Sequence, residues 1–166
     1  MKRILVILLA IVAIPPLANA AEKPAADEVV VGSIDKPLPH SENERSSFLW
    51  QTFANKPEEK KFASYTTQGW KDNFTAFQDA LVRKALSQKL DTNSLCKALG
   101  LILKDSPGLA YLPVGAHQTS LKHKPVWILV LKWEAQGTPQ AMNLEHICVF
   151  AFDQKTLKQV GYVTCR

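Results

Sequence analysis

The stretch PVWILVLKWE, residues 125–134, decides the fold of this chain of 166 residues. Its apolar side chains alternate with a period of two, which is the period of a β-strand. One side of that strand carries Trp127, Leu129, Leu131 and Trp133. The other side carries Val126, Ile128 and Val130. Apolar residues on both sides are typical of a strand at the centre of a sheet, so this stretch predicts a central strand.

Further strands and helices are predicted on either side of this stretch. Residues 109–114 (LAYLPV) predict a short edge strand, because Pro113 has no N–H to donate to a neighbouring strand. Residues 144–152 (LEHICVFAF) and 158–165 (KQVGYVTC) predict two more strands. Apolar residues recur every three or four positions after Ser41, over 70–86 and over 92–103, which predicts helices. The sequence therefore predicts an α+β fold, with N-terminal helices packed on one face of a C-terminal antiparallel meander of three to four strands.

The first twenty residues, MKRILVILLAIVAIPPLANA, have the three parts of a secretory signal peptide. Lys2 and Arg3 precede an apolar run, residues 4–14, that is too short to span a bilayer core of roughly 30 Å. Residues 18–20 (ANA) then supply the small side chains of a cleavage site. We predict that residues 1–20 are cut off after Ala20, which makes the mature protein periplasmic or secreted. An uncleaved anchor is the alternative.

The mature chain is predicted to hold a mobile arm, residues 21–40, and a single α+β domain, residues 41–166. The three valines at 29–31 are the exception in the arm and fit a short edge strand. Without Lys2 and Arg3 the 20 basic residues fall to 18, against 15 acidic residues, so the mature net charge is +3. A charge this small and scattered argues against nucleic acid as a partner. No second apolar run is long enough for a stable membrane anchor, and the sequence does not specify an oligomeric state.

Cys96, Cys148 and Cys165 predict one disulfide and one leftover thiol in an exported chain. If the last hairpin loop spans residues 153–157, Cys148 and Cys165 point to opposite sides of the sheet. If it spans 154–157, they share a face but lie diagonally, about 7–8 Å apart. A disulfide prefers Cα atoms within about 6.8 Å of each other. We therefore favour a Cys96–Cys165 disulfide that fastens the last strand to the third helix, with Cys148 as the alternative partner of Cys96.

No catalytic motif, metal site or cofactor is predicted. His146 and Cys148 share one side of a strand, an arrangement that a nucleophilic thiol would need, but no third residue orients them, and a packed structural pair is the favoured interpretation. His117 and His123 are two loop histidines, and a zinc site needs three or four ligands with characteristic spacing, so no zinc site is predicted. The segment KHK, residues 122–124, is interpreted as a solvated turn. The chain lacks nucleophile-elbow, zinc-protease and phosphate-loop motifs.

The side of the central strand that carries the two tryptophans has two interpretations. It is core if helices cover both faces of the sheet. It is an interaction surface, made by Trp127, Leu129, Leu131 and Trp133, if helices cover only the other face. From the second interpretation we predict a non-catalytic binding protein with a protein partner in the cell envelope, such as an inhibitor, an immunity-type partner or an envelope accessory factor. The alternative is a small-ligand-binding module or enzyme with a pocket between sheet and helix, lined by Trp127, Leu129 and Trp133 and with His146 as a further candidate.

Overall fold

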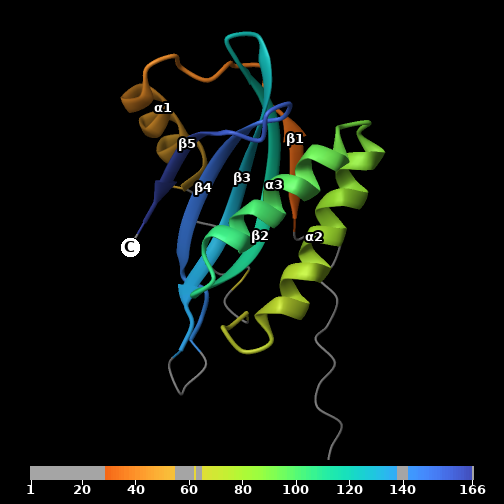
Figure 1. Cartoon of the computed structure of the whole chain (residues 1–166), viewed down its shortest axis with the longest axis vertical. Coiled ribbons are helices and arrows are strands. Elements are labelled where there is room, and N and C mark those ends of the chain that lie inside the picture. Colours follow the sequence, from red (N-terminus) through yellow and green to blue (C-terminus); the bar gives the residue numbers. More distant parts are fainter. Residues whose placement is uncertain (1–28, 55–61, 63–64, 138–141, 166) are drawn as a thin grey trace, which may run out of the picture.

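The computed structural model describes residues 29–54, 62, 65–137 and 142–165, and the predicted signal peptide lies outside these residues. They form a five-stranded sheet with strand order β1-β2-β3-β4-β5, accompanied by helices (Figure 1). The elements are β1 (Val30–Ser33), α1 (Glu42–Leu49), the π-helical turn η1 (Trp50–Ala54), α2 (Trp70–Ser87), α3 (Thr92–Asp105), β2 (Leu109–Leu121), β3 (Lys124–Ala135), β4 (His146–Asp153) and β5 (Gln159–Thr164). The predicted α+β class is confirmed, and the long helices precede the meander β2–β5.

The sheet is mixed, which corrects the prediction of a purely antiparallel meander of three to four strands. Strands β2 to β5 pair antiparallel in chain order, as predicted. The additional strand β1 pairs parallel with β2, from Val30 opposite Gly115 to Ser33 opposite Gln118. Because β1 holds only four residues, its sequence carries too few periods to reveal its partner or direction. With β1 paired and Leu38 buried, the described part of the predicted arm packs on the sheet.

Helices cover both faces of the sheet, which corrects the prediction that they pack on one. The tryptophan face, which carries Trp127, Leu129 and Leu131, packs in one core with α2 and α3. The valine face, which carries Val126, Ile128 and Val130, packs in a second core with Leu49 of α1 and with η1. In Figure 1, α2 and α3 lie in front of the sheet, and α1 lies beside β5. The apolar residues on both sides of β3 require this arrangement, because either face left bare would expose them to water.

The start of α3 is fixed by its N-cap, Asp91. Its carboxylate accepts hydrogen bonds from the backbone N–H groups of Asn93 and Ser94, at 3.1 and 3.3 Å. The side chain of Ser94 and these backbone donors stabilise the charged form, so the pKa of Asp91 lies below its ordinary value. No helix among the described residues is long and apolar enough to cross a membrane.

A bulge in the last hairpin sets the positions of the cysteines. The Asp153 N–H donates to the Lys158 carbonyl at 3.0 Å, so the loop spans 154–157, and Leu157 adopts φ = 57° within it. Phe152 pairs with Gln159 but Ala151 pairs with Gly161, which leaves Val160 as the extra residue of the bulge. Beyond it, Cys148 pairs with Thr164 rather than Val163. One inserted residue therefore turns Cys165 away from the face that Cys148 occupies.

The predicted disulfide is wrong, because all three cysteines are free. Cys165 packs against the valine-face core, whereas α3, which carries Cys96, contributes Leu95, Ala98 and Leu99 to the tryptophan-face core. The sheet thus lies between the two predicted partners. The alternative pair also fails, because Cys148 is buried in the tryptophan-face core and Cys96 lies outside that core, half-exposed.

We expect alkylation without reductant to separate the three thiols by burial. Cys148 is only 1% exposed, and burial holds the pKa of its thiol well above the ordinary value, so little reactive thiolate forms. In the folded protein, maleimide should label Cys96 and Cys165 and leave Cys148 unmodified. In denaturant all three should react, as peptide mapping by mass spectrometry would show. Recovery of an internal disulfide-linked peptide would contradict this assignment.

Candidate functional site

The structure places the predicted interaction residues inside the protein, with one exception. The side chains of Trp127, Leu129 and Leu131 have no exposed surface, because α2 and α3 cover them. The indole N–H of Trp127 donates a hydrogen bond of 2.8 Å to the Ser94 hydroxyl in the first turn of α3. These three residues therefore belong to the core, which was the other interpretation of this face. Trp133, at the end of β3, is partly exposed.

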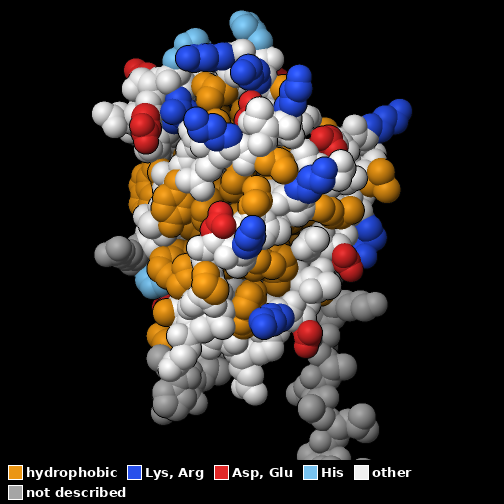
Figure 2. All heavy atoms as spheres, in the orientation of Figure 1, with side chains coloured by type: hydrophobic (Ala, Val, Ile, Leu, Met, Phe, Trp, Pro, Cys, Tyr) orange, Lys and Arg blue, Asp and Glu red, His pale blue; other side chains and the backbone are white. Residues whose placement is uncertain are grey.

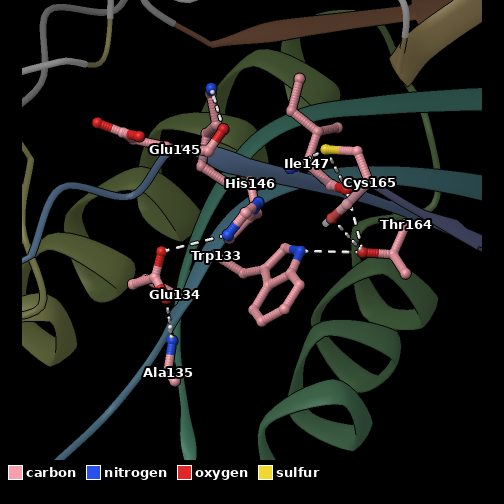
Figure 3. A network of polar contacts seen from close by, with 9 residues as sticks. Trp133, Glu134, Ala135, Glu145, His146, Ile147, Thr164 and Cys165 are labelled. Carbon is pink, nitrogen blue, oxygen red and sulfur yellow. Dashed lines mark hydrogen bonds and ion pairs between the residues drawn. The ribbon is translucent and has the colours of Figure 1, made fainter.

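Trp133 belongs to a polar network that joins the ends of three strands (Figure 3). Its indole N–H donates to the Thr164 hydroxyl on β5 at 3.0 Å, and its ring lies 4.9 Å from the His146 ring on β4. His146 in turn approaches the carboxylate of Glu134 at 3.5 Å. These contacts tie β3, β4 and β5 together at one end of the sheet.

The thiol and the imidazole at this end of the sheet are both engaged in contacts with neighbouring residues. The Cys165 sulfur accepts a hydrogen bond from the Ile147 N–H at 3.0 Å, and its thiol lies 3.4 Å from the Ile147 carbonyl (Figure 3). His146 contacts Glu134 and Trp133, so the imidazole is engaged away from Cys148. Cys148 itself is buried, with a raised thiol pKa that disfavours the thiolate. This geometry suits a structural role for His146 and Cys148, the interpretation that the sequence favours.

A cavity of about 130 Å³ lies on the valine face, between the sheet and η1. Its lining is mainly apolar. The apolar lining residues are Val30, Phe53, Phe62, Val114, Val130 and Ile147, together with Gly115. Two side chains with nitrogen groups, His117 and Lys132, complete the wall. Apolar walls with a few polar groups are the usual composition of a small-molecule site.

The cavity is built by β1, β2, β3, β4 and η1 together. Gly115 lies in β2 at the cavity wall and leaves space there because it has no side chain. A Cβ at this position would lie 3.4 Å from Val130 and 3.6 Å from His117. The His117 ring lies 4.9 Å from the Phe53 ring of η1, with their planes tilted by 42°. Strand and helical turn thus meet through aromatic contact at one side of the cavity.

Lys132 supplies the one permanent charge among the described lining residues. Its side chain is only 4% exposed, and its ammonium donates to the backbone carbonyl of Glu145 at 3.1 Å. Buried lysines are nearly always paired with a carboxylate. Within the described residues, however, the Glu134 carboxylate contacts the His146 imidazole, and no carboxylate lies within ion-pair distance of Lys132.

The remaining basic residues considered from sequence lie elsewhere. Lys122, His123 and Lys124 are exposed at the turn between β2 and β3. Figure 2 shows basic and histidine side chains gathered at that end of the molecule. The turn is thus solvated, as the sequence suggests. Among the described residues, no three histidine, cysteine or acidic side chains gather as a metal site would require.

The sequence pattern places Lys132 on the valine side of the central strand without indicating a role for it, and it suggests His117 only as a candidate metal ligand. One available signal is the alternation of side chains along β3, which places Lys132 on the same side as Val126, Ile128 and Val130. A lysine at the end of an apolar side marks either the edge of the core or a buried charge. Deciding between these requires knowing that η1 covers this side.

The fold and site define a small α+β protein with a ligand-sized cavity between its sheet and a helical turn. Comparisons with protein-family models, with curated proteins and with solved structures found no match in any of the three.

Proposed function

We propose that this chain is a non-catalytic binding protein that holds a small, largely apolar molecule in the valine-face cavity. The cavity itself is the observation that carries the proposal. A protein cavity of about 150 Å³ lined by apolar side chains accommodates benzene. The present cavity, at about 130 Å³, is therefore of the right size for a single ring or a short branched chain.

The burial of the tryptophan face supports binding of a small molecule over binding of a protein partner, which is the function predicted from the sequence. A partner cannot reach Trp127, Leu129 or Leu131 while α2 and α3 cover them. Of the four predicted interaction residues, only Trp133 is left with accessible surface, and its indole N–H is engaged by Thr164. The alternative prediction is a pocket between sheet and helix on the tryptophan face; the cavity lies on the other face of the sheet and shares none of the residues predicted for that pocket.

Export remains part of the proposal. The charged start, apolar run and small-residue site of residues 1–20 support a signal peptide cut after Ala20. The mature protein would then meet its ligand in the periplasm or outside the cell. Mass spectrometry of the exported chain should give an N-terminus at Ala21, and retention of residues 1–20 would contradict export by cleavage.

Binding of benzamide, a neutral single-ring probe, tests the proposed function. We expect saturable shifts of backbone amide signals around Val130 and Ile147 in two-dimensional NMR spectra. We expect Gly115→Val to abolish them. A Cβ at this position lies at ordinary contact distance from the lining residues Val130 and His117, so the added side chain is expected to take up cavity space. Gly108→Val is the matched control, since Gly108 precedes β2 and has open space around it. Circular dichroism should show both variants folded.

Two results would contradict the proposal. One is the absence of saturable shifts in the unmodified protein. The other is equal binding by the folded Gly115→Val variant and by the control, which would place the probe outside the cavity.

A further inference from the structure

We propose that the natural ligand is a small organic anion whose charged group binds Lys132 and whose apolar body fills the rest of the cavity. This inference rests on the proposed function and names the chemical class of the ligand. Lys132, in the cavity wall, would be the counter-ion of the ligand's charged group.

The first argument is the incomplete pairing of the Lys132 ammonium. An ammonium group carries three N–H donors, and the described structure supplies one acceptor, the neutral carbonyl of Glu145. A charge removed from water without an opposite charge is costly. With the side chain 4% exposed, bulk water compensates little of this cost. A bound carboxylate would supply both the missing charge and further acceptors.

The second argument is the charge of the cavity wall. The described lining contains one lysine, one histidine and no acidic residue. The nearby carboxylate of Glu134 is occupied by His146 and by the Ala135 N–H, at 3.5 and 2.9 Å. The charge carried by the described lining residues therefore favours an anion over a cation.

The third argument is the position of Lys132 relative to the apolar lining. Val130 lies two residues away on the same side of β3, and Ile147 is opposite Lys132 on β4. The ammonium thus adjoins a wall of aliphatic side chains. A ligand with a carboxylate at one end and an apolar ring or branched chain at the other matches this division, and a ring of about six heavy atoms matches the volume.

Benzoate and benzamide provide the test, because they have nearly the same shape and differ in charge. At neutral pH and low salt, we expect benzoate to bind the unmodified protein about tenfold more tightly than benzamide, since hydrogen bonds to charged groups are the stronger ones. Lys132→Met should bring the ratio of the benzamide and benzoate dissociation constants close to one, whatever its effect on benzamide binding itself. Dissociation constants would come from NMR titration.

Lys124→Met is the matched control, because it removes one positive charge from the same strand at an exposed position outside the cavity. It should keep the tenfold preference for benzoate. Lys132→Arg keeps the positive charge and should therefore retain part of the preference for benzoate.

The outcomes separate this inference from the proposed function. If the unmodified protein binds benzamide as tightly as benzoate, the anion preference is overturned and the cavity remains a ligand site. Equal loss of the preference in Lys124→Met and Lys132→Met overturns it too, since general charge would then be the cause. If neither probe binds, the proposed function and the inference both fail.

Discussion

Replacing Trp127 with alanine is expected to lower the free energy of unfolding by about 3–5 kcal/mol, the range for buried aromatic residues. The Trp127 side chain is completely buried at the centre of the sheet. Its indole N–H also holds Ser94, so the substitution leaves a cavity and weakens the attachment of α3 to β3. Urea denaturation followed by circular dichroism would measure the loss.

Two further variants give this prediction its controls. Trp127→Phe keeps most of the apolar volume and removes the hydrogen bond, so its effect should be smaller than that of alanine. Trp50→Ala, at a side chain that is 37% exposed, should change stability by about 0.5 kcal/mol or less. If Trp127→Ala resembled Trp50→Ala, the assignment of the tryptophan face to the core would be wrong.

Leu49→Ala is expected to cost about 2–5 kcal/mol, because Leu49 carries the packing of α1 onto the valine face. Its side chain has no exposed surface. Leu49 also lies so close to β5 that a Cβ at Gly161 would sit 3.0 Å from its Cδ1 atom. Its truncation therefore opens a void between helix and sheet, which urea denaturation would report.

The same substitution at an exposed leucine isolates the effect of burial. Leu86 lies in α2 and is 65% exposed, so Leu86→Ala should leave the free energy of unfolding nearly unchanged. If helices covered only the tryptophan face of the sheet, Leu49 would have no core to pack into. Equal effects of the two alanine substitutions would therefore contradict the second core.

The regular elements of this fold were predictable because their apolar residues recur with a clear period over many positions. Residues 70–86 and 92–103 predict the helices that the structure shows as α2 and α3. Residues 125–134 predict β3, whose apolar residues on both sides also imply that both faces are covered. The direction of β1 and the face chosen by α1 depend on contacts between distant segments, so local periodicity could not supply them.

The disulfide prediction is wrong because of one extra residue in the last strand. The loop 154–157 is one of the loops that the sequence allows, but Val160 forms a bulge beyond it. Because side chains alternate along a strand, a single extra residue moves every later side chain to the other face. Sequence patterns do not reveal bulges of this kind, and the chosen disulfide partner depended entirely on that register.

The cavity was predictable only as a general possibility. A pocket between sheet and helix follows from the α+β class, but its lining combines residues from four strands and η1. Lys132 acquires its meaning from two facts absent from the sequence, which are its burial and the pairing of Glu134 with His146.

Intermolecular nuclear Overhauser effects between benzamide and methyl-labelled protein test the central claim most directly. A probe inside the valine-face cavity should give contacts from its ring protons to methyl groups of Val114, Val130 and Ile147, which all line that cavity. Contacts confined to another surface, such as the groove lined by Trp70 and Leu103 between α2 and α3, would contradict the claim, as would an absence of contacts at saturating probe.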